Sequence, residues 1–379
     1  MRITLFCDLS EEKRTSMEVY ADSLRSALNS ISDGGFKIKK FQPHQVNSFK
    51  GLCFLPLRSK IDNYYSRFIY YPRQARRYQG DVNHIVDHGY GHLVFSLDPK
   101  RTIVTCHDLI LLKCKSGELP INAPVIATKM FQYSIKGMGK AARIIAVSEN
   151  TKKDILTYAR CDPARIKVIY QGINSKFRKI EDERFLEKIR RKYSLGSSSP
   201  RLLHVGHSRY KNVEAVIQAL VILKRDFGMS CELITVGLDF TPKQKRLVDL
   251  LGVKKFIVTL NHVPIDDLVG IYNLADVLVF PSLYEGFGWP PLEAMTCGIP
   301  AVTSNVASLP EVVGDAAIMV HPLDYQGIAA AVYAVLTNSE LRSDLISKGL
   351  KRASRFTWEK AAKHTLEVYE EVYKSAKET

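Results

Sequence analysis

The chain has 379 residues, which is long for one ordinary domain and sufficient for two. Hydrophobic residues make up 46% and charged residues 25%, a composition that argues against a disordered or fibrous protein. The 54 Lys and Arg against 39 Asp and Glu give a net charge of +15. This charge is compatible with binding to nucleic acid, to an anionic membrane surface or to an anionic small substrate. It is equally compatible with a basic surface that only faces solvent.

The sequence shows no sign of a membrane-spanning or disulfide-bonded protein. No apolar run is long enough to cross a bilayer, and the apolar segment near the amino terminus is too short for a signal peptide. The seven cysteines are odd in number and lack a Cys-x-x-Cys pair, which disfavours a disulfide framework and a zinc site. We therefore expect a cytoplasmic protein, with peripheral attachment to a membrane as an open alternative.

The first half of the chain alternates between strand and helix patterns. Strands are predicted over 3–7, 36–41, 82–86, 102–105, 144–147 and 166–169. Helices are predicted over 17–28, 63–79, 129–140 and 149–158. Strands that alternate with helices indicate βαβ units and a parallel sheet. The pattern predicts a first domain over residues 1–175.

Polar residues directly follow two strands of this half. His88 and Tyr90 come after the strand over 82–86, and His107 and Asp108 come after the strand over 102–105. The carboxyl ends of parallel strands form the ligand-binding edge of such a sheet. His107 is therefore a candidate catalytic residue, and His88, Tyr90 and Asp108 are candidates for an acceptor pocket. An ordinary structural role is the alternative for each of them.

The second half begins after a segment with the character of a linker. Residues 174–200 are densely charged and end in Gly-Ser-Ser-Ser-Pro. Strands are then predicted over 202–205, 233–236, 256–260, 277–280, 301–303 and 317–320, with helices between them. This pattern predicts a second parallel-sheet domain over residues 199–356. A helical pattern over 358–374 closes the chain.

Residues 281–298 carry the clearest chemical information. A glycine-bearing loop follows a strand, and the loop leads into a helix through Pro290 and Pro291, which suit a first helical turn. Helix N-termini at the carboxyl end of a strand bind anions. Glu285 and Glu293 flank this point. We interpret them as ionised acceptors for sugar hydroxyls rather than as a glycosidase pair, with a solvated loop residue and a helix cap as the alternative.

A second candidate site is the turn from Gly206 to Asn212, directly after the strand over 202–205. Its glycine, Arg209 and Lys211 suit a diphosphate, although a basic surface turn has the same composition. The turn is not a P-loop, because Gly-Lys-Ser/Thr is absent. No Asp-x-Asp occurs in a strand–loop context, and no His/Cys cluster has metal spacing. We therefore expect cations and a helix N-terminus, and no metal, to balance the charge of a leaving diphosphate.

Several of these motifs together resemble the retaining glycosyltransferases of family 4, also called glycosyl transferases group 1. The matching segments are Phe-Pro-Ser-Leu-Tyr-Glu-Gly-Phe-Gly over 280–288, Pro-Leu-Glu-Ala-Met over 291–295, Gly-Ile-Pro over 298–300, Ser-Leu-Pro-Glu-Val over 308–312, and shorter matches at 107–108, 147–149, 171–174 and 356–358. The resemblance covers nearly the whole chain and is most specific in the second half. It implies the GT-B fold, in which two Rossmann-like doubly wound parallel-sheet domains face a cleft. The second domain would bind the donor, the first the acceptor, and the last helix, 357–379, would cross back to the first domain.

The resemblance also implies roles for individual positions. Lys211 resembles the lysine on the donor diphosphate, next to Gly206 and with Arg209 as a second cation. Glu285 resembles the glutamate that contacts the transferred sugar, and Glu293 the one that holds the ribose hydroxyls. The other donor-side positions are Gly286, Phe287 and Gly288 near the sugar and phosphates, His262 and Val263 near the base, and His107 close to the transferred sugar.

The chain departs from the family pattern at two points. Many members have a glycine turn after the first strand, where donor phosphate approaches the first domain, whereas residues 8–17 contain no glycine here. His207 stands where relatives often have arginine directly after the glycine. The resemblance therefore does not predict whether the first domain contributes to binding of the donor phosphate.

These features predict metal-independent transfer of a hexose-type sugar, with retention, from a UDP-, GDP- or ADP-sugar to a hydroxyl of a sugar, glycan or lipid-linked acceptor. No cofactor is expected, and the lack of an evident nucleophile favours a front-face route. The alternatives are a nucleotide-sugar epimerase, a phosphorylase on the same fold, and a basic nucleic-acid or membrane-binding module, although no nucleic-acid recognition motif is present. The basic helix pattern over 129–140 fits an anionic membrane surface. It also describes an ordinary amphipathic helix packed on its sheet, which is the interpretation we favour.

Overall fold

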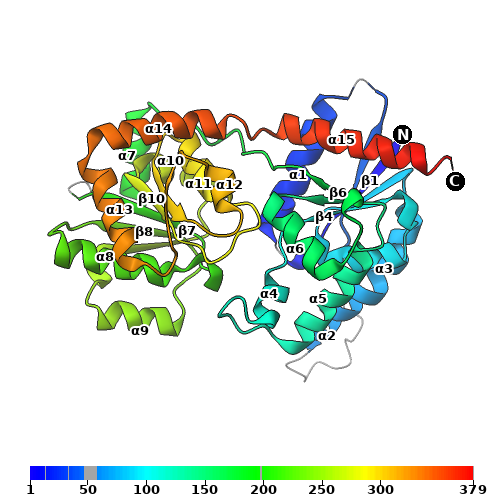
Figure 1. Cartoon of the computed structure of the whole chain (residues 1–379), viewed down its shortest axis with the longest axis horizontal. Helices are drawn as coiled ribbons and strands as arrows, with labels where there is room; N and C mark the ends of the chain where they lie inside the picture. Colours follow the sequence, from blue (N-terminus) through cyan, green and yellow to red (C-terminus); the bar gives the residue numbers. More distant parts are fainter. Residues whose placement is uncertain (13, 33, 47–57, 197–198, 379) are drawn as a thin grey trace. The chain divides into compact units, whose positions relative to one another are not determined.

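The chain forms two compact units in the computed structural model (Figure 1). The structure describes residues 1–12, 14–32, 34–46, 58–196 and 199–378, with backbone alone for 58–60. The first unit comprises Met1–Gly172 together with Thr357–Thr379, and the second comprises Ile173–Phe356. Each unit contains a six-stranded sheet in which the paired strands run parallel. The predicted fold class, two Rossmann-like units of the GT-B type, is confirmed.

The sheet of the first unit has the strand order β2-β1-β3-β4-β5-β6. Its strands are β1 (Arg2–Phe6), β2 (Lys37–Phe41), β3 (Val82–Ile85), β4 (Thr102–Cys106), β5 (Arg143–Ala146) and β6 (Ile166–Val168). All six lie within one residue or so of the predicted strands. The order changes direction between β1 and β3, and such a switch point is where open α/β sheets bind ligands, beyond the carboxyl ends of the strands.

The helices of the first unit were predicted less completely than its strands. They are α1 (Thr15–Ser30), α2 (Arg58–Tyr65), α3 (Tyr71–Ala75), α4 (Ile110–Ser116), α5 (Val125–Met138), α6 (Glu149–Ala159) and α15 (Trp358–Ser375). The helix predicted over 63–79 is in fact α2, a π-helical turn at Ser66–Tyr70, and α3, which has Pro72 in its first turn. Helix α4 was not predicted. Ser148 caps α6 as expected, because its side chain accepts a hydrogen bond from the Thr151 amide.

The last helix belongs to the first unit. Helix α15 packs against α1, beside which it lies in Figure 1. Its Tyr369 is fully buried and its hydroxyl is 2.6 Å from Nδ1 of His84 on β3. Nε2 of His84 is in turn 2.7 Å from Oγ1 of Thr105 on β4. A buried polar chain therefore joins the carboxyl-terminal helix to the middle of the sheet.

The sheet of the second unit has the order β12-β11-β10-β7-β8-β9, which changes direction between β7 and β10. Its strands are β7 (Arg201–Val205), β8 (Glu232–Gly237), β9 (Ile257–Asn261), β10 (Val277–Phe280), β11 (Ala301–Ser304) and β12 (Ile318–Val320). Its helices are α7 (Glu183–Lys192), α8 (Val213–Asp226), α9 (Pro242–Leu250), α10 (Ile265–Leu274), α11 (Trp289–Thr296), α12 (Leu309–Val313), α13 (Tyr325–Thr337) and α14 (Ser339–Ala353).

Residues 173–175, which the sequence assigned to the first domain, lie in the second unit. So do residues 176–196, which the sequence left between the two predicted domains. Helix α7 packs against α10, and Leu186 and Ile189 are its buried residues. The charged residues that suggested a linker occupy its outer face. Asp182 caps this helix by accepting hydrogen bonds from the amides of Arg184 and Phe185.

Candidate active site

Two loops of the second unit meet at its switch point. Residues 206–212 follow β7, and residues 281–288 follow β10, the strand paired with β7. The amide of Leu283 donates to the carbonyl of Tyr210 at 2.7 Å. Nδ2 of Asn212 donates to the carbonyls of Pro281, at 3.0 Å, and Pro322. These bonds fix the two loops to each other, so the groups they carry have a set geometry.

A buried ion pair joins the loops. Nζ of Lys211 lies 2.7 Å from Oε1 of Glu285, and the two side chains are 14% and 8% exposed. The ammonium also lies 4.7 Å from the centroid of the Phe280 ring, on β10. Gly206, at φ +101°, makes room for the lysine, because a Cβ atom there would lie 3.1 Å from the Lys211 side chain. The structure therefore brings together the two residues predicted to bind the diphosphate and the transferred sugar.

The glutamate loop is held in place by a serine from the segment before α12. Oγ of Ser308 lies within hydrogen-bond distance of the carbonyls of Glu285, at 3.0 Å, and Phe287, at 2.8 Å. Gly288 has φ +104° and directly precedes α11, whose first turn contains the two predicted prolines. The positive φ favours glycine here, and a Cβ atom would in addition lie 2.7 Å from the end of the Leu309 side chain. Glu285 is thus presented from a fixed loop before a helix of eight residues.

Glu293 occupies a different environment on α11. Its Oε2 accepts a hydrogen bond at 2.7 Å from the hydroxyl of Tyr272, a fully buried residue of α10. Burial raises the pKa of Glu293 to about 7, although the Tyr272 hydrogen bond and the Lys211 charge both act to lower it. The expectation that the helix terminus keeps Glu293 fully ionised therefore needs correction, because burial outweighs the groups that favour the charge.

The remaining donor-side residues lie at the same edge of the sheet. Arg209 is exposed in a 3-10 turn. His262, after β9, is exposed and has φ +51°, and Val263 is half-buried. His207 packs beside Phe240 with ring centroids 5.5 Å apart, and neither of its buried ring nitrogens has a hydrogen-bond partner in the described chain.

A cluster of buried charges occupies the switch point of the first unit. Asp8 follows β1, Asp87 follows β3, and Arg14 lies between them, with its NH1 2.6 Å from Oδ2 of Asp87. Burial opposes ionisation of Asp87, but the Arg14 guanidinium and other contacts outweigh it and hold its pKa well below the usual range. Burial, and then the Asp87 charge, raise the pKa of Asp8 well above its usual value. Asp8 and Arg14 both lie within residues 8–17, the segment that contains no glycine.

His107 is buried and both of its ring nitrogens have partners. Nε2 is 2.8 Å from the carbonyl of Val86, which can only accept, so Nε2 carries the hydrogen. Nδ1 then accepts from Nε2 of Gln171 at 2.9 Å. Burial lowers the pKa of His107 to about 4, so the ring is neutral at pH 7. This histidine is held in one tautomer and is not available as a proton carrier while both hydrogen bonds persist.

The three candidate acceptor residues are less accessible than expected. Tyr90 is fully buried, and its hydroxyl accepts a hydrogen bond from the Leu9 amide. His88 is nearly buried, and its Nδ1 accepts from the His107 amide at 3.2 Å. Oδ1 of Asp108 accepts from the Ile110 amide at the start of α4. In this structure Tyr90 is a core residue, and Asp108 contributes to the start of a helix.

Some residues that organise the site were not singled out from the sequence. Asn212 and Ser308 lie inside quoted motifs, so the motifs marked the segments but not the hydrogen bonds these side chains make. Gln171 was likewise part of a matching segment. No motif in the sequence marks Tyr272. It contacts Glu293 from another helix, 21 residues earlier in the chain, and only the fold brings the two together.

No group of three or more His, Cys, Asp or Glu residues within the described ranges has the arrangement of a metal site.

Among the helices of the described chain, none combines the length and the apolar character that crossing a membrane would require.

Comparison with known proteins identifies the class. The model of "Glycosyl transferases group 1" matches residues 186–352, and the model of "Glycosyltransferase Family 4" matches residues 38–177. O-antigen chain mannosyltransferase B of Escherichia coli is 30% identical over 273 residues, which cover 71% of this chain and 70% of that protein. The chain therefore belongs to the group 1, family 4 glycosyltransferases, and it is an enzyme of that class.

Two further relatives show the extent of the likeness. The serotype-specific mannosyltransferase WbdA of Escherichia coli is 30% identical over 289 residues, 74% of this chain but 35% of that protein. The chain thus spans about a third of the length of WbdA. The crystal structure of Anabaena HepE with UDP and glucose superposes with a TM-score of 0.72 at 17% identity, over 98% of this chain and 100% of HepE.

Proposed function

We propose that this protein transfers a hexose-type sugar from a nucleotide-sugar to an acceptor hydroxyl, with retention and without a metal ion. Mannose is the sugar we favour, because the relatives at 30% identity are named as mannosyltransferases. A nucleotide-sugar donor is favoured because the HepE structure holds UDP and glucose on the same fold. UDP-, GDP- and ADP-sugars are the donors to compare.

The observation that carries this proposal is the buried pair of Lys211 and Glu285 at the switch point of the second unit. The lysine supplies a positive charge for a donor diphosphate, and the carboxylate supplies acceptors for sugar hydroxyls. Glu293, on the next helix, supplies a second carboxylate for the ribose. These three groups match the diphosphate, the transferred sugar and the ribose of a nucleotide-sugar.

The reaction needs few groups from the chain. In a front-face route, the bond from the anomeric carbon to the diphosphate breaks while the acceptor oxygen bonds to the same carbon. The leaving phosphate oxygen takes the acceptor's proton. Lys211, Arg209 and the amides at the start of α11 would stabilise the charge that grows on the diphosphate. His107 is a fixed neutral ring of the first unit, and this proposal gives it no role as an acid or base.

A donor screen tests the proposed function directly. The purified protein is incubated with UDP-, GDP- and ADP-hexoses, with and without EDTA, and release of the nucleotide diphosphate is measured. We expect one nucleotide to support turnover that EDTA does not abolish, and NMR of the product to show the donor's anomeric configuration. Absence of turnover with every donor and acceptor tried, or loss of activity with EDTA, would contradict the corresponding part of the proposal.

Donor affinity should depend on pH through Glu293. Its pKa of about 7 means that the carboxyl gains a proton, and loses an acceptor site for ribose hydroxyls, as the pH falls through 7. We expect the donor KM to rise over that range. Tyr272→Phe removes a hydrogen bond that lowers this pKa, so the rise in KM should begin at a higher pH.

The test is the pH profile of donor kcat/KM for the wild type and for Tyr272→Phe. Tyr333→Phe, which changes another tyrosine of the second unit, is the control and should leave the profile in place. A Tyr272→Phe profile that is unchanged, or that moves to lower pH, would contradict the assignment of Glu293.

We further propose that one face of the first unit binds an anionic membrane. Helix α5 buries Thr128, Ser134, Ile135, Gly137 and Met138. Its outward side exposes large apolar side chains, namely Val125 (70%), Ile126 (64%), Tyr133 (47%) and Met130 (37%). The outer side of this helix is therefore apolar as well as basic, unlike that of a helix that merely packs on its sheet.

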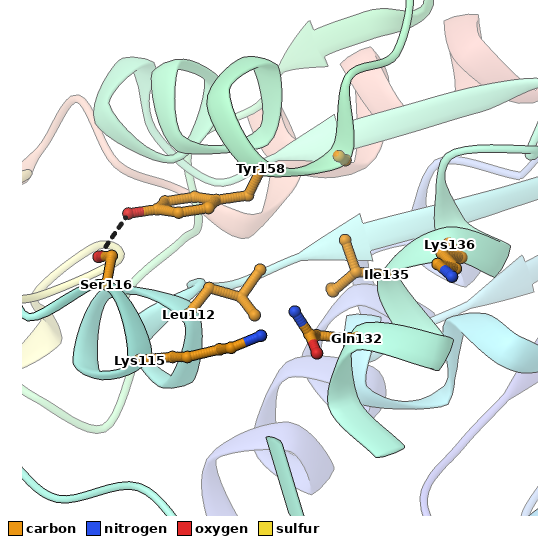
Figure 2. A pocket seen from close by; sticks show the side chains of 8 residues that line it. Leu112, Lys115, Ser116, Gln132, Ile135, Lys136 and Tyr158 are labelled. Atoms are coloured by element: carbon orange, nitrogen blue, oxygen red, sulfur yellow. Dashed lines mark hydrogen bonds between the residues drawn. The ribbon is translucent and has the colours of Figure 1, made fainter. Parts of the chain in front are cut away.

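A groove lined by lysines runs beside these apolar residues. A cavity of 340 Å³ between α4, α5 and α6 is lined by Lys115, Lys136 and Gln132, among others, and Figure 2 shows these side chains around it. An adjoining cavity shares Lys115 and Gln132 and adds Lys129. Apolar groups beside lysines match the acyl chains and anionic head groups of a lipid surface.

Vesicle sedimentation tests this surface. We expect the protein to sediment with phosphatidylglycerol vesicles at low salt, less at high salt, and not with phosphatidylcholine vesicles. Replacing Ile126 and Met130 with Ser should weaken binding, and each of Lys115→Gln and Lys129→Gln should weaken it about fivefold. Leu250→Ser, which changes an exposed leucine of the second unit, should have no effect. Failure to bind anionic vesicles at low salt would rule the surface out.

A further inference from the structure

A cavity of 480 Å³ lies within the first unit and has a mixed aromatic and polar lining. Three rings line it, those of Tyr64, Phe68 and Phe131. Two amides, Gln45 and Asn63, and two guanidinium groups, Arg14 and Arg67, complete its polar part. Pockets for small ligands commonly combine such apolar walls with a few placed polar groups.

The cavity adjoins the switch point of the first sheet. Its Arg14 is the residue that binds Asp87, two positions after the end of β3. The ring of Phe131, which also lines the cavity, contacts the ring of His88 with centroids 5.3 Å apart. His88 is the residue directly after Asp87. The cavity therefore lies where the topology of the sheet predicts a ligand. The acceptor-binding residues predicted from the sequence were His88, Tyr90 and Asp108, which do not line this cavity.

An irregular helix supplies part of the wall. Arg67 and Phe68 belong to the π-helical turn at Ser66–Tyr70, between α2 and α3. Such turns are rare and occur often at functional sites, because they redirect side chains that a regular helix would carry elsewhere. Here Arg67 donates to Glu12 at 3.1 Å and to the carbonyl of Gly89. The turn thus holds Phe68 beside a guanidinium whose two terminal nitrogens both have partners, whereas its buried Nε has none within the described chain.

The charges around the cavity cancel one another. Arg14 pairs with Asp87 at 2.6 Å and with Glu12 at 3.2 Å, and Arg67 pairs with Glu12 at 3.1 Å. Asp8 is a third carboxyl group beside Arg14, at 3.8 Å, and burial together with the Asp87 charge raises its pKa. Both guanidinium groups thus already have carboxylate partners, and a phosphate or carboxylate ligand would have to displace one of them. Electrostatics therefore favour an uncharged ligand.

The lining also matches the chemistry of an uncharged sugar. Aromatic rings offer apolar faces to the C–H side of a pyranose ring, and amides both donate to and accept from its hydroxyls. Asn63 donates one amide hydrogen to Glu12, at 3.5 Å, and its side-chain oxygen accepts no hydrogen bond from the described residues. Gln45 is half-buried at the rim of the same cavity.

We infer that this cavity binds a neutral pyranose ring of a saccharide acceptor, through Tyr64, Phe68 and Phe131 as stacking surfaces and Asn63 and Gln45 as hydrogen-bonding groups. The role of the bound sugar as an acceptor rests on the proposed transferase function, but binding of the sugar does not require turnover. It assigns the acceptor's sugar to a pocket, and it excludes the phosphate of a lipid carrier as the group bound there.

Saturation-transfer NMR on the full chain tests binding without any donor. The probes are methyl α-D-mannopyranoside, methyl α-D-mannobioside and mannose 6-phosphate. We expect ring protons of the two neutral glycosides to be saturated in the wild type and about tenfold weaker binding in Tyr64→Ala, whose ring is partly exposed and dispensable for the core. Phe95→Ala, a 45% exposed aromatic outside the cavity, is the matched control and should bind as the wild type does. No saturation of either neutral glycoside, or stronger binding of mannose 6-phosphate, would overturn the inference.

A kinetic arm separates this inference from the proposed function. In Tyr64→Ala and Asn63→Ala, we expect acceptor KM to rise about tenfold while donor hydrolysis in the absence of acceptor is unchanged. If the wild type turns over donor and acceptor but these variants match Phe95→Ala in acceptor KM, the pocket assignment fails and the function stands. If the neutral glycosides bind at Tyr64 but no nucleotide-sugar is turned over, the pocket stands and the transferase proposal fails.

Discussion

Replacing Lys211 with Ala is expected to lower turnover by about 10²–10³-fold with little change in the fold. The lysine ammonium is held over the Phe280 ring and against Glu285, in a site that is mostly closed to water. A charge in such a place stabilises a leaving diphosphate far better than a mobile surface lysine does, because its position is set before the reaction begins. The loss should therefore fall on kcat as well as on donor KM.

The control variant is Lys243→Ala, which removes an exposed lysine of α9 in the same unit. It should leave turnover and KM at wild-type values. Circular dichroism and thermal unfolding of both variants establish that the fold is intact. Near-normal activity of folded Lys211→Ala would remove the central residue of the proposed donor site.

Replacing Glu285 with Ala should have two separate effects. It removes the carboxylate proposed to contact the transferred sugar, so turnover should fall by orders of magnitude. It also leaves Lys211 as a mostly buried cation without its partner, and breaking such a pair costs about 3–5 kcal/mol of unfolding free energy. A nucleotide diphosphate can supply the missing negative charge. It should therefore raise the thermal midpoint of Glu285→Ala by more than it raises that of the wild type.

Differential scanning fluorimetry with UDP, GDP and ADP measures this second effect. Glu340→Ala serves as the control, because it removes an exposed glutamate from the first turn of α14. In that variant the diphosphate should shift the midpoint as it does in the wild type. An equal or smaller shift in Glu285→Ala would show that Lys211 does not meet the diphosphate, even if turnover is lost.

The parts of this structure that the sequence predicted follow from local patterns. The strands β7 to β12 are short, mostly apolar runs of three to six residues, so they could be placed to within about a residue. Pro290 and Pro291 marked the first turn of α11, because proline fits only there in a helix. Lys211 and Glu285 could be paired in advance only as members of two motifs, each at the carboxyl end of a strand.

The parts that were missed depend on contacts between distant segments. Helix α7 reads as a charged linker because a solvated helix and a linker share their composition, and only its packing on α10 distinguishes them. The pKa of Glu293 could not be predicted, because the burial that raises it comes from the surrounding fold. Tyr90 follows a strand just as His107 does, and only the packing around it shows that its ring lies in the core.

Because helix α15 comes last in the chain, the first unit cannot be completed until the end of the chain has been synthesised. Its sheet is built from residues before 170, but Tyr369 closes the polar chain that begins at His84 and Thr105. During translation, the whole of the second unit leaves the ribosome before residues 358–375 appear. The second unit is continuous in sequence and has every segment it needs at that moment. Until then, Nδ1 of His84 lacks its Tyr369 partner, so the unit whose synthesis begins first is completed last.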